Sequence, residues 1–335
     1  MSVPSEHDPL RLLHFQEGVV TMRIIRNLGV LRVVICLAVM GTAGAIDSDD
    51  ARRIRVVTST TDLAALAREV GGNRVEVTSL AVGYEDPHFV PVSASGLLKL
   101  KRADLFIVIG LEMEVAWLGE RLVPSPVLQS RNPRIRFGSE GYFDVSPYVQ
   151  VVEVPAPVTR AQGIHPLGNP HYWLDPENGR RIARAIATRL GVLHPKDAPY
   201  FEQRFASFNH RLSDKERLWE KRMKPYRGYK VVSYHRAWGN FLKRFDLVSV
   251  GEIEPFPGIA PYDEHTDDLV TEMKRQHVRV ILVEPSYKLT NARKIAAETG
   301  AKVLVVPGSV GGVTQASDYF SLIEYNVASL IRAFQ

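Results

Sequence analysis

Cysteine is nearly absent from this chain of 335 residues: there is one, Cys36, in an apolar stretch near the N-terminus. An internal disulfide is therefore excluded, and stability must come from the core and from bound ligands. The Gly-x-x-x-x-Gly-Lys-Ser/Thr loop that cradles nucleotide phosphates is also missing, so ATP hydrolysis must be the task of a partner. The His-Glu-x-x-His pattern of zinc-protease helices does not occur either.

Strong charge of one sign is lacking too. The formal net charge is +5, and basic residues are interspersed with acidic ones, so no nucleic-acid partner is expected. Beyond the N-terminal stretch no apolar run is long enough to span a bilayer, and passage across a membrane would need a separate permease. The apolar fraction of 45% and the charged fraction of 24% are typical of a folded protein, and the length suits two domains.

Residues 1–45 have the pattern of a secretory signal peptide. Several arginines precede an apolar core at residues 33–40, and the small residues 43–45 supply a cleavage site. The apolar core is too short for a transmembrane helix. We therefore expect cleavage after Ala45 and export of the mature chain to the periplasm.

Two features of this leader leave alternatives open. Met22 is an alternative translation start, because residues 1–21 are polar and precede it. Lipid attachment at Cys36 is a second alternative, although Ile35 is bulky where a lipoprotein signal carries a small residue. Without the leader, the mature protein contains no thiol.

From Ile54 onward, strand-like apolar runs alternate with helical patterns. This alternation predicts βαβ units, an α/β fold class and mainly parallel sheets. The longest helical pattern, residues 197–223, would span about 40 Å and suits a rigid spine between two lobes. We expect an N-terminal lobe at residues 46–195, a linking helix at 196–225 and a C-terminal lobe at 226–335.

The second lobe contains four apolar runs, which begin near Lys230, Leu247, Val278 and Lys302. Most of them lack the alternation of a strand with one wet face, which predicts parallel strands covered on both sides. Open α/β sheets bind their ligands in the loops at the carboxyl ends of the strands. Two facing lobes would therefore hold a ligand site in the cleft between them.

Three of the ten histidines share one property, because each falls where a predicted strand gives way to a loop. They are His88, His171 and His235. Any one of them alone is better explained as a hydrogen-bonded loop histidine, but three at such positions predict a metal site in the cleft. Three neutral imidazoles plus one oxygen match the tetrahedral preference of Zn²⁺. The histidines in or beside charged helical segments are expected to be solvated: His194, His210 and His277.

Short motifs surround these histidines and recur further along the chain. They are Asp86–His88, Asn169–Pro176, Ser233–His235, Ile253–Pro255 and Ile281–Pro285. In these motifs and their order the chain resembles the zinc- and manganese-specific solute-binding proteins of ABC importers. The resemblance extends from residue 54 to residue 335. It implies two βα lobes joined by one long helix, with the three histidines as metal ligands in the cleft.

Two departures from this family pattern concern the metal site. The loop Val306–Gly312 offers no carboxylate where many members place an aspartate ligand. Glu284, at the end of a predicted strand, is our first candidate for the fourth ligand, with a water molecule as the alternative. The stretch Pro155–Ile164 is short and is followed only by His165, which does not suit the metal-scavenging loop of many zinc-specific members.

The sequence thus predicts reversible capture of Zn²⁺ in the periplasm, with Mn²⁺ as the alternative ion. The expected partners are an ABC permease and its ATPase subunit; the chain is expected to be a monomer that reaches the inner membrane only through the permease. No enzymatic chemistry is expected. Two other classes stay open: an exported zinc hydrolase with Glu284 as general base, and a surface protein in cell adhesion that uses the same scaffold.

Overall fold

The computed structural model describes residues 53–119, 125–155, 165–256 and 258–335. The predicted leader, with Met22, Cys36 and the cleavage site after Ala45, lies outside the described residues. The described residues belong to one compact unit. Among them, no helix combines the length and the apolar character needed to cross a membrane.

The first sheet has four parallel strands in the order β2-β1-β3-β4. Their bounds are Ile54–Thr58 for β1, Val75–Ser79 for β2, Leu105–Val108 for β3 and Tyr142–Asp144 for β4. The helices of this lobe are α1 (Thr61–Gly71), α2 (Ala94–Arg102), α3 (Val115–Leu118) and α4 (Pro126–Gln129). All four residues of β3 are buried, because this strand has a neighbour on each side and helices over both faces.

The second sheet repeats this arrangement with the order β6-β5-β7-β8, again all parallel. Its strands are β5 (Lys230–Ser233), β6 (Val248–Glu252), β7 (Val280–Val283) and β8 (Lys302–Val305). The helices between them are α7 (Gly239–Arg244), α8 (Asp263–Gln276) and α9 (Thr290–Thr299). The prediction of strands covered on both sides holds for β5 and β7. It fails for β6 and β8, which are partly exposed because each lies at an edge of the sheet.

Three longer helices complete the fold. They are α5 (Pro176–Leu193), α6 (Ala198–Met223) and α10 (Tyr319–Phe334). Short 3₁₀ turns lie at Gly72–Arg74, Pro133–Ile135, Ser146–Tyr148, Tyr172–Leu174, Pro195–Asp197 and Lys224–Tyr226. Helix α5 begins after Asp175, whose side chain accepts a hydrogen bond from the Glu177 backbone N–H at 3.0 Å.

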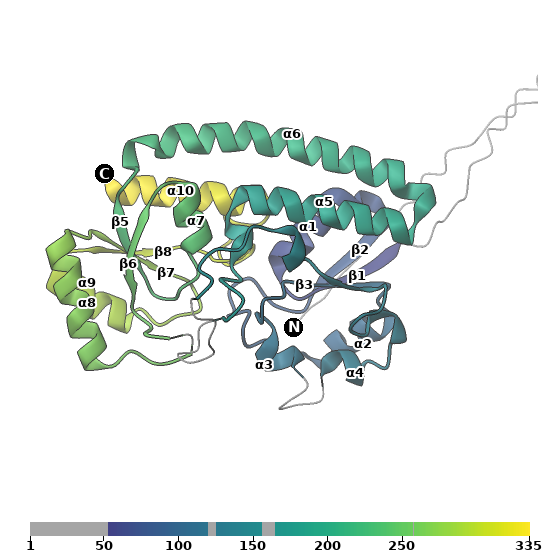
Figure 1. Cartoon of the computed structure of the whole chain (residues 1–335), viewed down its shortest axis with the longest axis horizontal. Coiled ribbons are helices and arrows are strands. Elements are labelled where there is room, and N and C mark those ends of the chain that lie inside the picture. Colours follow the sequence, from purple (N-terminus) through teal and green to yellow (C-terminus); the bar gives the residue numbers. More distant parts are fainter. Residues whose placement is uncertain (1–52, 120–124, 156–164, 257) are drawn as a thin grey trace, which may run out of the picture. The chain divides into compact units, whose positions relative to one another are not determined.

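Helix α6 is the long helix that joins the two lobes. Its 26 residues make it about 39 Å long, and it packs on α5 and α1 of the first lobe and on α10 beside the second sheet. Figure 1 shows α6 extending over both α5 and α10. Its buried stripe contains four aromatic residues: Phe201, Phe205, Phe208 and Trp219. The chain therefore has the expected fold class, two βα lobes joined by one long helix.

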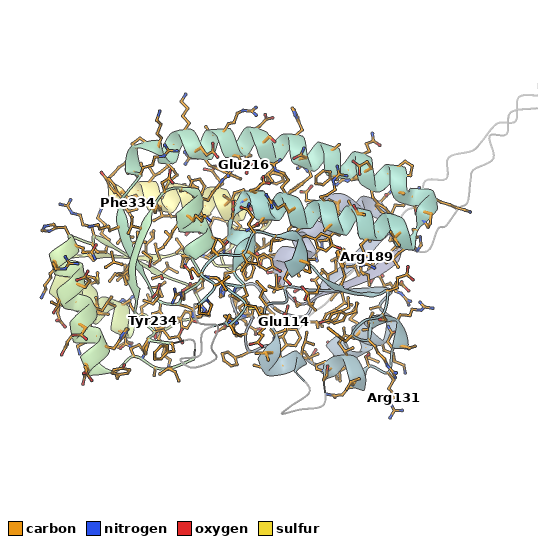
Figure 2. The ribbon with its side chains drawn as sticks, in the orientation of Figure 1. Glu114, Arg131, Arg189, Glu216, Tyr234 and Phe334 are labelled. Carbon is orange, nitrogen blue, oxygen red and sulfur yellow. The ribbon has the colours of Figure 1, made fainter. Side chains whose placement is uncertain are left out.

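A buried ion cluster fixes α6 to helices of both lobes. Glu216 of α6 is 6% exposed and lies between α6 and the helices beneath it (Figure 2). It accepts hydrogen bonds from Arg180 of α5 and, at 2.7 Å, from Arg244 of α7. Because a buried carboxylate needs such partners, this cluster couples the two lobes through the long helix.

The lobes also approach each other closely at a pair of loops. Asp62, at the start of α1, is fully buried and accepts a hydrogen bond from the Val310 backbone N–H at 2.8 Å. Gly83 lies so near the Val310 carbonyl and the backbone of Gly311 that an added Cβ would collide with them. Only glycine permits this contact, and the loops that follow β2 and β8 are thereby held side by side.

Replacing Gly179 by alanine is expected to destabilise the protein by about 1–3 kcal/mol, the usual cost of overpacking a core. The added methyl group would collide with the hydroxyl of Tyr319, which is fully buried and donates to the Trp173 carbonyl at 2.7 Å. Gly191→Ala, in the same helix, is the control, because its methyl group would meet only Ala198, at 3.2 Å. Urea unfolding measures both; equal stability of the two variants would contradict this packing.

Candidate metal centre

Three histidine rings from separate segments meet between the two lobes. His88 follows β2, His171 precedes the turn that leads into α5, and His235 follows β5. The centroids of each pair of rings are 5.1 Å apart, so the rings form a nearly equilateral triangle. One ring nitrogen of each lies within 4.8 Å of the others, and all three side chains are buried. The sequence-predicted histidines are therefore brought together.

The same short motif orients the first two rings. In Asp86-Pro87-His88, Asp86 Oδ1 accepts from the His88 backbone N–H at 2.9 Å and contacts His88 Nδ1 at 2.7 Å. In Asn169-Pro170-His171, Asn169 Oδ1 does the same, at 2.9 Å for both contacts. A side-chain oxygen two residues before each histidine thus fixes both its backbone and its ring.

The third ring is oriented from a neighbouring strand. His235 Nδ1 lies 2.7 Å from Oε2 of Glu254, which follows β6. The other oxygen of Glu254 accepts from the Gly258 backbone N–H at 2.7 Å, so the carboxylate is held at both ends. Carboxylate partners of this kind fix the tautomer of a metal-binding histidine and raise its basicity.

These contacts determine which ring nitrogen is available. Carboxylate oxygens only accept hydrogen bonds, so Nδ1 carries the proton in His88 and His235. Asn169 also presents its oxygen to His171, because its amide nitrogen donates to Glu153 Oε2 at 3.0 Å and to a backbone carbonyl. In each neutral ring Nε2 therefore carries the lone pair that can bind a metal ion. In His235 this atom is buried and has no hydrogen-bond partner.

The electrostatics suit an incoming cation. Burial, together with the neighbouring histidines, lowers the pKa of His171 well below 6.5, so this ring is neutral at pH 7. Burial alone would raise the pKa of Asp86, but its hydrogen bond with His88 and the charge of that ring lower it to about 2. A neutral imidazole and an ionised carboxylate are the states that metal binding requires.

Glu284, the predicted fourth ligand, lies beside these rings but is not part of the three-residue cluster. It lines a cavity of about 30 Å³ together with His171 and His235. One carboxyl oxygen accepts from Trp238 Nε1 at 2.8 Å, and the other is buried without a partner. Burial raises the pKa of Glu284 to about 8, with the nearby carboxylates Asp86 and Glu254 adding to the shift.

Sequence reasoning did not assign several residues of this centre. Asp86, Asn169 and Glu254 were only parts of motifs, and His165 was noted only as a solitary loop histidine. His165 Nε2 lies 3.1 Å from His88 Nε2. The histidines predicted to be solvated lie elsewhere: His210 and His277 are exposed, and His194 is half-buried beside Asp197. The signal available for Asp86 and Asn169 was the repeated spacing Asx-Pro-His.

Changing Glu254 to glutamine is expected to weaken metal binding by about 10- to 100-fold, the usual effect of removing a partner of a ligand. The neutral amide no longer supports the positive charge of the bound ion and can turn a donor toward His235 Nδ1. Glu298→Gln, which changes an exposed carboxylate on α9, is the matched control. Equal zinc affinities for both variants and the wild type, in a chelator competition titration, would contradict this role.

Two βα lobes with a buried cluster of three histidines between them define a two-lobed binding protein whose cleft carries metal-type donors. Residues 56–333 match the family described as zinc-uptake complex component A, periplasmic. Because this match covers most of the chain, the chain belongs to that family. The family consists of substrate-binding components of metal ABC transporters and not of enzymes, so the hydrolase alternative is set aside.

Individual relatives agree with this assignment. The chain is 22% identical over 308 residues to the metal ABC transporter substrate-binding lipoprotein SloC of Streptococcus mutans, covering 89% of this chain and 95% of that protein. It is 22% identical over 300 residues to the manganese ABC transporter substrate-binding lipoprotein PsaA of Streptococcus pneumoniae, covering 87% and 91%.

Solved structures support the fold. A crystal structure of ZnuA superposes with a TM-score of 0.70 at 21% identity, covering 84% of this chain and all of that one. A mutant of the laminin-binding adhesin Lmb from Streptococcus agalactiae superposes with a TM-score of 0.69 at 24% identity, covering 84% and 100%. At this level of identity these similarities establish the two-lobed fold alone.

Proposed function

We propose that this chain captures one Zn²⁺ ion between its lobes and delivers it to an ABC importer. The observation that carries the proposal is the convergence of three rings whose Nδ1 atoms are all engaged, which leaves three Nε2 donors facing one region. Tetrahedral Zn–N bonds of about 2.0–2.1 Å would place these nitrogens roughly 3.3 Å apart. The ion would draw the three donors slightly closer together.

The donor set supports zinc over manganese. Imidazole nitrogen suits Zn²⁺, whereas Mn²⁺ is held better by carboxylate, carbonyl and water oxygens. The cluster within 4.8 Å consists of histidines alone among the described residues. The manganese named for one group of relatives remains the alternative ion.

The fourth position has an oxygen candidate in Glu284, the residue predicted from the sequence. Its unpartnered buried oxygen and its place in a cavity shared with His171 and His235 support this role. The raised pKa of Glu284 argues against a role as ligand, because a carboxyl with a pKa of about 8 must lose a proton before it binds zinc at pH 7. A water molecule is the alternative oxygen donor.

Delivery requires partners that this chain does not supply. A permease would carry the ion across the inner membrane and an ATPase subunit would drive it, and the binding protein would meet the permease as a monomer in the periplasm. The predicted leader and the family to which the chain belongs support export. Adhesion, the activity named for Lmb, is tested separately by binding of the purified protein to laminin.

Competition between the two ions tests the proposed cargo. At equal free concentrations, zinc is expected to be bound in preference to manganese by at least about a thousandfold, because the donors are nitrogen. Glu284→Gln should reduce zinc affinity by about 10- to 100-fold if the carboxylate is a ligand, and leave it unchanged if water holds that position. Binding of manganese equal to or tighter than that of zinc would overturn the zinc assignment.

A further inference from the structure

A fourth histidine adjoins the cluster of three, although, like Glu284, it is not among the residues whose donor atoms all lie within 4.8 Å of one another. The Nε2 atom of His165 lies 3.1 Å from His88 Nε2, and the two rings stack with their centroids 5.2 Å apart. His165 is half-buried and lines a cavity of about 20 Å³ together with His171 and His235. This is a different cavity from the one lined by Glu284, so the two residues adjoin the cluster through different cavities.

The hydrogen bonds of the two rings indicate which nitrogen of each neutral ring can bind a metal ion. His88 Nδ1 faces the Asp86 carboxylate and carries the proton of the neutral ring, so His88 Nε2 is bare. His165 makes a hydrogen bond to the Leu111 backbone that favours the protonated ring, as an accepting carbonyl does. Since its Nε2 faces His88, the nitrogen that donates to Leu111 is Nδ1. In the neutral rings that bind a metal ion, the two Nε2 lone pairs therefore face each other at 3.1 Å.

A cation resolves this arrangement. Two bare nitrogens repel each other, but both are satisfied by a metal ion placed between and beside them. Two nitrogens on one tetrahedral zinc ion lie roughly 3.3 Å apart. The separation of the His88 and His165 nitrogens is already close to this value. The pair thus has the spacing of two ligands of the same ion.

The partner of His165 is itself held in an unusual conformation. Leu111 and Glu112 both have positive φ angles, of 51° and 65°, in a turn that begins at Gly110. Such backbone is unfavourable for residues other than glycine and persists only where other contacts impose it. Buried Glu114 imposes it here, because it accepts from the Ile109 backbone N–H at 2.7 Å and from that of Gly110 at 3.1 Å.

We propose that His165 is the fourth ligand, so that the bound ion is held by four imidazole nitrogens. The inference rests on the proposed function, because it presumes that His88, His171 and His235 hold the ion. It places His165 in the position for which the sequence suggested Glu284 or water. Four imidazoles and no carboxylate disfavour Mn²⁺, so His165 is also a determinant of ion specificity.

X-ray absorption at the zinc edge, on protein loaded with one equivalent of Zn²⁺, counts the imidazole ligands directly. We expect four imidazoles in the wild type and three plus an oxygen in His165→Ala. The same substitution should lower zinc affinity about 100-fold, as loss of one of four donors does, and should reduce the preference for zinc over manganese. His165→Gln, which keeps most of the side-chain volume, should give the same loss of one imidazole.

His210→Ala, which removes an exposed histidine of α6, is the matched control and is expected to keep all four imidazoles. A wild-type spectrum with three imidazoles, or an unchanged spectrum in His165→Ala, would overturn the assignment of His165 while leaving the three-histidine site intact. If the wild type takes up no zinc, or if His171→Ala gives the wild-type spectrum, the proposed function fails as well. Thermal melting of the metal-free variants checks that each one is folded.

Discussion

Replacing His171 by alanine is expected to reduce zinc affinity by about two to three orders of magnitude. Zinc held by four protein donors gains about 10–16 kcal/mol in all, or roughly 2.5–4 kcal/mol per donor, and each 1.4 kcal/mol is a factor of ten. His171 is the most suitable residue for this test, because it is 4% exposed and already neutral. No proton has to leave it when the ion binds.

The same substitution at His210 is the control for this experiment. The His210 side chain is 82% exposed on α6, beside Asp214, so His210→Ala should bind zinc like the wild type. Without metal, both variants should retain the melting temperature of the wild type within a few degrees. A His171→Ala protein that binds zinc within threefold of the wild type would show that this ring is not a ligand.

Zinc affinity is expected to fall as the pH falls from 7.5 to 5, because protons compete with the ion for imidazole nitrogen. Three histidine ligands considered from the sequence alone predict up to about a thousandfold loss per pH unit in the limit. The structure reduces this limit, because burial and the neighbouring histidines lower the pKa of His171 well below its usual value, so that this ring competes less with protons.

The fourth ligand determines the slope between pH 6.5 and 8. Glu284 has a raised pKa of about 8, so binding through its carboxylate releases a proton and weakens about tenfold for each unit below pH 8. Binding through His165 releases no proton in this range, because burial and the neighbouring histidines lower its pKa to about 3. Isothermal titration in two buffers of different ionisation enthalpy counts the protons released. A flat affinity from pH 7.5 to 5 would contradict a histidine site.

Much of the fold was predictable because its signals are local. The alternation of apolar runs with helical patterns indicated parallel sheets, and the longest helical pattern, residues 197–223, corresponds to α6. The exposure of β6 and β8 was not predictable, because an edge strand and a central strand of a parallel sheet have similar sequences. Strand order is decided by packing between distant segments, which a single sequence does not display.

The candidate site was predictable only in part. The predicted strand ends led to all three ligand histidines, but a strand end was the wrong reason for His171, because the described residues 145–155 and 165–170 before it contain no strand. His165 gave no such signal, because it follows no strand and its partners, His88 and Leu111, are far away in the sequence. The hydrogen bond between Glu284 and Trp238 could not be predicted either, because these residues are also far apart in the sequence. Contacts between loops of the two lobes depend on the whole fold.

Anomalous diffraction at the zinc edge, from crystals of the protein grown with one equivalent of Zn²⁺, tests the central claim most directly. The account predicts one strong peak per chain, about 2.0–2.1 Å from the Nε2 atoms of His88, His171 and His235. The Nδ1 atoms of these rings should keep their contacts with Asp86, Asn169 and Glu254. A peak at any other place, or bound through Nδ1, would contradict it.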